Sequence, residues 1–164
     1  MTEKPTKYYS SLQEKRIADY LGWSAVSASG ARPFTPGDIK SSEWLAECKT
    51  HTSETDTITI NKAVWEKIAT EAKGSFRRPV LFVDNGTQQI KNTWAIFPAA
   101  LYYGDSLEQA VASYKETAKK ITFKHSELTK NLNKDMKYLK IFIGSVSLYI
   151  VKTEVFKELF CGGD

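Results

Sequence analysis

Cysteine and histidine are scarce in this chain, with two of each among 164 residues. Cys48 and Cys161 are too few to build a disulfide framework, and this usage is typical of a protein that works in a reducing compartment. His51 and His125 are too far apart in the sequence to supply the paired ligands of a zinc finger. The scarcity of both residue types therefore excludes disulfide-stapled secreted domains and zinc-finger modules.

Long apolar runs are missing as well, because no run approaches the ~20 residues that a membrane-spanning helix requires. The first ten residues are polar and do not look like a signal peptide. We therefore expect a cytoplasmic protein with no membrane partner. The remaining composition is ordinary for one globular domain, with 41% hydrophobic and 26% charged residues. The net charge of +4 allows nucleic-acid binding but does not require it.

Hydrophobic periodicity predicts an α/β fold, in which helices flank a mixed central β-sheet. The predicted helices cover residues 11–21, 61–73, 105–120 and 153–160. The predicted strands cover residues 23–26, 39–49 (as a strand pair), 57–60, 79–83, 93–97, 138–143 and 146–151. We divide the chain into a flexible arm (1–10), a core (11–100) and a C-terminal extension (101–164) packed on the same domain.

Three charged residues, Asp38, Glu47 and Lys49, outline a candidate site for breaking phosphodiester bonds. Asp38 follows a turn, and Glu47 and Lys49 stand two residues apart on the strand predicted at 43–49. Because side chains alternate along a strand, Glu47 and Lys49 share one face of it. The opposite face carries the residues expected to pack under helices: Trp44, Ala46 and Cys48.

An acid two residues before a lysine is a weak signal by itself, since chance or a structural salt bridge explains most such pairs. The chain contains two further examples: Glu71/Lys73 and Asp135/Lys137. The first lies on a predicted helix, where residues two apart do not face each other. Glu47 and Lys49 differ because an acid precedes them at a turn, and because helical spacing turns Glu14 toward the inward face of helix 11–21.

These residue types suit a magnesium site, because Mg²⁺ prefers oxygen ligands and keeps several waters. We expect Asp38 and Glu47 to supply carboxylate ligands and the Cys48 backbone carbonyl a third. Glu14 is expected to bind a second ion or to hold a water. Lys49 is placed to orient or help deprotonate the attacking water and to offset developing negative charge.

The order Glu14, then Gly37-Asp38, then Glu47-Cys-Lys49 resembles the PD-(D/E)XK nuclease superfamily. Within it, the chain is similar to archaeal-type Holliday junction resolvases, which some phages also carry. The similarity extends over about residues 10–100 and includes the Ser/Gly-rich loop at 27–32. One departure is Gly37, which stands where the superfamily name expects proline.

The resemblance implies a restriction-endonuclease-like core, with residues 101–164 as an α/β extension beyond it. It also implies a Mg²⁺-dependent endonuclease that acts on branched DNA, most plausibly a Holliday junction resolvase. Mn²⁺ is expected to substitute for Mg²⁺, and no organic cofactor is expected. Two symmetric cuts imply a homodimer. If a phage encodes the protein, its compartment is the host cytoplasm.

Several polar and basic residues are candidates for DNA contacts, although each is also typical of an ordinary solvated surface. They are Ser29, Gly30, Arg32, Arg77, Arg78, Lys119 and Lys120. Two alternatives to a resolvase stay open at this stage. One is another DNase of the superfamily, of restriction, nicking or exonuclease type. The other is a catalytically silent DNA-binding module that retains the fold.

Overall fold

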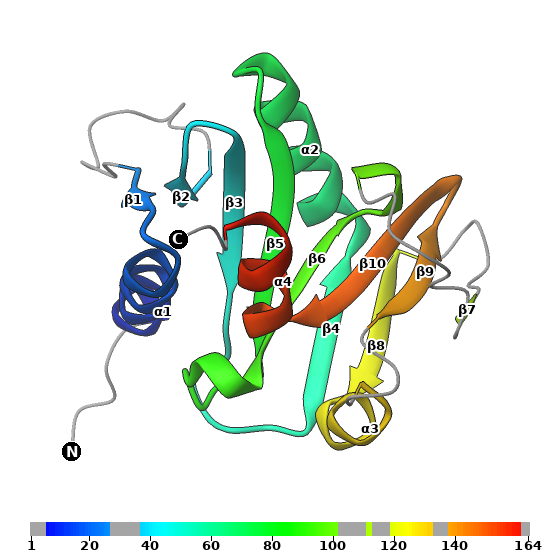
Figure 1. The fold of residues 1–164 in the computed structure, drawn as a ribbon. Helices are drawn as coiled ribbons and strands as arrows, with labels where there is room; N and C mark the ends of the chain where they lie inside the picture. Colours follow the sequence, from blue (N-terminus) through cyan, green and yellow to red (C-terminus); the bar gives the residue numbers. More distant parts are fainter. Residues whose placement is uncertain (1–5, 27–36, 102–110, 113–118, 133–137, 162–164) are drawn as a thin grey trace.

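The structure, a computed structural model, describes residues 6–26, 37–101, 111–112, 119–132 and 138–161 (Figure 1). Its helices are α1 (Thr6–Leu21), α2 (Lys62–Gly74), α3 (His125–Asn131) and α4 (Thr153–Phe160), with 3₁₀ turns η1 (Ile90–Asn92) and η2 (Ala99–Leu101). Its strands are β1 (Ser24–Ala25), β2 (Ile39–Lys40), β3 (Trp44–Lys49), β4 (Thr57–Asn61), β5 (Arg78–Asp84), β6 (Thr93–Pro98), β7 (Val111–Ala112), β8 (Lys120–Lys124), β9 (Leu139–Ile143) and β10 (Val146–Lys152). The fold is therefore α/β.

The main sheet is mixed, with the strand order β1-β2-β3-β5-β6-β10-β9-β7, and β4 and β8 form a separate antiparallel pair. β5 runs parallel to β3 over the whole length of β3, and α2 lies on the connection between them. β6 is antiparallel to β5, and β10 is antiparallel to the other side of β6. The C-terminal strands thus continue the sheet that contains β3.

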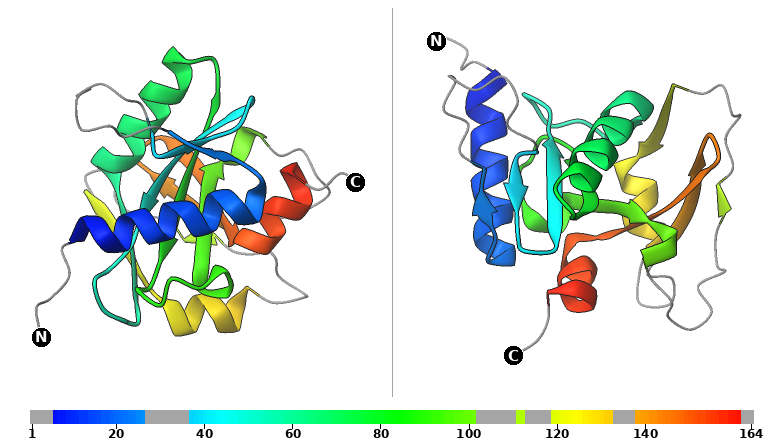
Figure 2. Two further views of the ribbon diagram at one scale, coloured as in Figure 1. Left: turned by 90° about the vertical axis from the view of Figure 1, so that its left-hand side faces the viewer. Right: turned by 90° about the horizontal axis from the view of Figure 1, so that it is seen from above.

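Alternating side chains along the central strands divide the core into two clusters on opposite faces of the sheet. In β3, Leu45 belongs to one cluster, and Trp44, Ala46 and Cys48 belong to the other. α2 and the β4–β8 pair contribute to the first cluster, and α1 and α4 contribute to the second. Figure 2 shows α2 and α4 on opposite sides of the sheet, with α1 beside β1, β2 and β3. The faces predicted for β3 are confirmed.

Most of the predicted elements are confirmed, because their sequence patterns are local. α2 begins after Asn61, whose Oδ1 accepts hydrogen bonds from the Ala63 and Val64 N–H groups at 2.9 and 3.3 Å. The β9–β10 turn has a positive φ of 62° at Gly144, as a type II′ turn requires at its first central residue. The helix predicted at 153–160 has the same bounds as α4.

Three predictions differ from the structure. The helix over 105–120 is wrong in the described part of that segment, because β7 occupies residues 111–112 and β8 begins at Lys120. Pairing with β4 and burial of Ile121 stabilise β8 as a strand. α1 begins at Thr6, so residues 6–10 of the predicted flexible arm are helical. Residues 125–131, for which no element was predicted, form α3.

Among the described residues, no helix is both long enough and apolar enough to cross a membrane.

Candidate active site

The Asp38 carboxylate binds the open edge of β3, next to Glu47. β2 pairs with β3 only at Leu45 and Ala46, so the end of β3 extends beyond its short neighbour. There the Asp38 side chain takes the place of a strand, because its Oδ2 accepts a hydrogen bond from the Cys48 N–H at 2.8 Å. The N–H and C=O groups of one strand residue point to the same side, so the Cys48 carbonyl is directed toward this edge.

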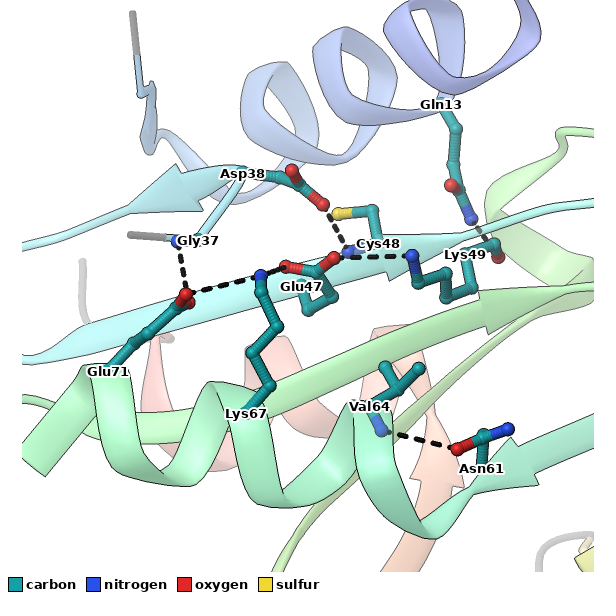
Figure 3. Close-up of polar contacts among 10 residues, drawn as sticks. All are labelled: Gln13, Gly37, Asp38, Glu47, Cys48, Lys49, Asn61, Val64, Lys67 and Glu71. Atoms are coloured by element: carbon teal, nitrogen blue, oxygen red, sulfur yellow. Dashed lines mark hydrogen bonds and ion pairs between the residues drawn. The ribbon is translucent and has the colours of Figure 1, made fainter. Parts of the chain in front are cut away.

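Glu47 lies between two lysines (Figure 3). Its Oε1 is 3.3 Å from Lys49 Nζ, and its Oε2 is 3.8 Å from Lys67 Nζ. The Glu47 side chain is only 10% exposed, whereas the side chains of Lys49 and Lys67 are 50% and 59% exposed. The two ammonium groups can therefore meet an anionic ligand from solvent while they hold the buried carboxylate.

Burial and mutual repulsion raise the pKa values of two carboxyl groups at this edge. The pKa of Asp38 rises from 3.8 to about 6, first because of burial and then because of Glu47, against a lowering by the Cys48 N–H and by lysines. The pKa of Glu14 rises from 4.5 to about 7, first through burial and then through Asp38 and Glu47. The contributions of Asp38 and Glu47 to this shift indicate that Glu14, a partly exposed residue of α1, lies near the other two acids.

Gln13, the neighbour of Glu14, is a buried contact that sequence reasoning missed. Its Nε2 donates a hydrogen bond to the Lys49 carbonyl at 2.6 Å, and the residue is 1% exposed. Gln13 lies four residues before Ile17, on the face that α1 buries, and this spacing is the signal that could have found it. The bond ties α1 to the end of β3.

Lys67 and Glu71 of α2 are further polar neighbours that were not predicted (Figure 3). Glu71 Oε1 is 3.1 Å from Lys67 Nζ, one helical turn away. Glu71 Oε2 accepts a hydrogen bond from the Gly37 N–H at 3.0 Å, immediately before Asp38. The signal for Lys67 is its spacing of four residues from Glu71, because such residues are neighbours on a helix.

The acids at this edge fit a hard divalent cation by their chemistry. Within the described segments, no group of three or more His, Cys, Asp or Glu side chains forms a compact metal cluster. Mg²⁺ does not need one, because it commonly takes one or two carboxylates and keeps several waters. The raised pKa values of Asp38 and Glu14 also fit, since a bound cation relieves repulsion among buried carboxylates. Asp38 and Glu47 are the side chains that could hold the ion.

The predicted DNA-contact residues are not brought together. Ser29, Gly30 and Arg32 lie outside the described residues. Arg77 donates a hydrogen bond through Nε to the Ser41 carbonyl, and Arg78 stacks over Trp44. Both arginines are near the start of β3, roughly 16 Å along the strand from Lys49 at about 3.3 Å per residue. Lys119 and Lys120 are exposed and lie beside the start of α2, where the Lys119 carbonyl accepts from the Lys62 N–H.

Comparisons of the chain with protein-family models, with curated protein sequences and with solved structures found no match.

Proposed function

We propose that this protein is a metal-dependent endonuclease that hydrolyses phosphodiester bonds in DNA. The observation that carries the proposal is the meeting of Asp38, Glu47 and Lys49 at one open strand edge, with Glu14 coupled to the two acids. A structural salt bridge accounts for Glu47 and Lys49 alone. It does not account for further acids held at raised pKa beside them.

Each side chain has a distinct role in this proposal. Asp38, Glu47 and the Cys48 carbonyl would hold Mg²⁺, or Mn²⁺ in its place. The bound ion would polarise a phosphate oxygen and lower the pKa of a water. Lys49, half exposed beside Glu47, would bind a phosphate oxygen and offset negative charge in the transition state. Glu14, whose pKa is raised to about 7 in the metal-free site, would hold a water near the ion or accept a proton from it.

The finer assignment is a Holliday junction resolvase with a restriction-endonuclease-like core. It is supported by the element order α1, β2, β3, α2 and β5, which carries Glu14, Asp38, Glu47 and Lys49 in the sequence order of the PD-(D/E)XK resemblance. Resolution of a four-way junction requires two opposed cuts, so the proposal includes a homodimer. Exposed lysines such as Lys119 and Lys120 would contribute contacts to phosphates that do not depend on base sequence.

The test uses the purified protein with a synthetic four-way junction, a matching linear duplex and a matching single strand. Each substrate is incubated with Mg²⁺ or with EDTA. We expect paired symmetric nicks in the junction, in Mg²⁺ only. Cleavage of the linear duplex would instead favour another DNase of the same chemistry, and binding without cleavage would favour a silent DNA-binding module.

Two variants with matched controls connect the activity to the site. Asp38→Asn should abolish cleavage, and Lys49→Met should lower its rate by about 10²–10⁴-fold. Asp19→Asn and Lys73→Met alter exposed residues on the same helices that flank the site and should cleave normally. Cleavage by Asp38→Asn and Lys49→Met at the wild-type rate would overturn the assignment.

A further inference from the structure

Glu71 is a partly buried acid of α2 that has no role in the site described so far. Its side chain is 23% exposed, and both of its oxygens are engaged. One oxygen pairs with Lys67 Nζ at 3.1 Å, and the other accepts from the Gly37 N–H at 3.0 Å. The Lys67 pair offsets its charge, and the Gly37 bond fixes its direction. A carboxylate that is available to bind a metal ion would be expected to have at least one oxygen without such a partner.

The backbone that Glu71 binds is the segment that carries Asp38. The Asp38 N–H donates to the Ala46 carbonyl at 2.7 Å, and the Asp38 carbonyl accepts from the Val26 N–H at 2.8 Å. These bonds fix the peptide groups of Asp38 toward β1 and β3. The Gly37 bond to Glu71 adds a contact from α2, on the other side of the same turn.

Gly37 itself is closely packed, so small movements of this turn matter. Its φ is +68°, and a Cβ placed there would lie 2.7 Å from Leu45 Cδ1. A residue with a side chain would therefore be strained in conformation and would crowd the buried Leu45 side chain. The Gly37 N–H must find an acceptor in a crowded position, and Glu71 supplies it. Without that acceptor, the Gly37 peptide would lose its contact with α2, and the Asp38 backbone would be held only by its bonds to Val26 and Ala46.

We propose that Glu71 is a positioning residue that sets the Asp38 carboxylate relative to Glu47 by anchoring the Gly37 peptide. This inference rests on the proposed function, because the position of Asp38 matters through the metal that it would hold. Residues that orient metal ligands typically contribute about 10–100-fold in metal affinity or activity. The expected defect lies in metal affinity, since the ligands themselves remain.

The experiment compares Glu71→Ala, Glu71→Gln and the control Glu66→Ala, which removes an exposed acid five residues earlier on α2. For each protein, the Mg²⁺ concentration for half-maximal junction cleavage and the rate at saturating Mg²⁺ are measured. Hydrogen exchange of the Gly37 amide is followed by NMR without metal. Glutamine retains an oxygen acceptor for the Gly37 N–H but loses the charge, so it separates anchoring from ligation.

We expect Glu71→Ala to raise the half-maximal Mg²⁺ concentration about 10–100-fold. It should also speed exchange at Gly37 and leave most of the rate at saturating Mg²⁺. Glu71→Gln should stay close to the wild type in all three readouts, like Glu66→Ala. If Glu71→Gln is as defective as Glu71→Ala while Gly37 stays protected, Glu71 is a ligand, and the positioning role is overturned.

Equal behaviour of Glu71→Ala and Glu66→Ala would also overturn the positioning role while leaving the proposed nuclease intact. A wild-type protein that neither binds Mg²⁺ nor cleaves DNA would overturn the proposed function, and the positioning role with it. Because Glu71→Gln preserves size and the hydrogen-bond acceptor, the comparison does not depend on the alanine variant remaining folded.

Discussion

Replacing Asp38 by asparagine should stabilise the metal-free protein while it removes the proposed activity. The folded protein holds the pKa of Asp38 at about 6, against 3.8 as its ordinary value, chiefly because of burial and then because of Glu47. Between these two pH values the folded state keeps a proton that the unfolded state releases. The free energy of unfolding therefore falls as the pH rises through this window, and the loss is complete above pH 6.

The size of this effect follows from the two pKa values. At about 1.4 kcal/mol per pKa unit, the gap between 3.8 and about 6 corresponds to roughly 3 kcal/mol. Asp38 retains some contact with solvent, which screens the charge, so we expect a gain of roughly 1–2 kcal/mol at pH 7.5. Asparagine has nearly the same shape, and its Oδ1 can still accept from the Cys48 N–H. The gain therefore comes from removing the charge.

Urea denaturation in EDTA measures the change. With a slope of about 2 kcal/mol per molar urea, the midpoint of Asp38→Asn should lie roughly 0.5–1 M above that of the wild type at pH 7.5. The two proteins should approach each other near pH 4, where the folded wild type is protonated at Asp38. The exposed control Asp19→Asn should show neither effect. An Asp38→Asn protein that is no more stable than the wild type at pH 7.5 would refute the claim that the charged Asp38 carboxylate destabilises the metal-free protein.

Three further predictions concern other parts of the structure. Lys49→Met should lower the rate of junction cleavage by about 10²–10⁴-fold with little change in thermal stability, as measured by single-turnover kinetics and calorimetry. Asn61→Ala should lower the free energy of unfolding by about 1 kcal/mol through loss of the α2 cap, and Asn61→Asp should restore it; equal urea midpoints for the three proteins would contradict this. Trp44→Ala should cost about 3–5 kcal/mol, because the ring is buried among Phe97 and Phe156, and a loss under 1 kcal/mol in urea denaturation would contradict this packing.

The parts of the site that could be predicted from sequence depend on local periodicity. Glu47 and Lys49 share a face of β3 because side chains alternate with a period of two, and this holds whatever the strand pairs with. Helical spacing set Glu14 near the stripe of Ile17 and Leu21, which is the signal that brought it into the hypothesis. Those two rules sufficed to bring three of the four charged residues into one hypothesis. Asp38 joined them through the turn that precedes it.

The parts that could not be predicted depend on contacts between elements distant in sequence. Gln13 reaches the Lys49 carbonyl across 36 residues, and Glu71 reaches Gly37 across 34. Nothing in the residues next to Gln13 or Glu71 in the sequence indicates which backbone group either side chain contacts. The sequence pattern paired Glu71 with Lys73, two residues away. Its ion-pair partner in the structure is Lys67, four residues away on the same face of α2.

In the part of the predicted helix 105–120 that the structure describes, the difference has a similar physical cause. A helical pattern in a lysine-rich segment is a weak preference, and pairing with another strand can outweigh it. β8 begins at Lys120 because the segment pairs with β4 from Asn61 to Thr57, which buries Ile121 against Ile60. Such pairing joins segments about 60 residues apart, so no local window contains it.

The central claim is that Asp38 and Glu47 together hold a divalent cation, and iron-mediated affinity cleavage tests it most directly. Fe²⁺ replaces Mg²⁺ in the purified protein, and ascorbate with hydrogen peroxide then generates radicals that cut the polypeptide near the bound ion. We predict cuts near residues 38 and 47–48, blocked by excess Mg²⁺ and absent from Asp38→Asn. Cuts elsewhere, or cuts at these positions that persist in Asp38→Asn, would contradict the claim.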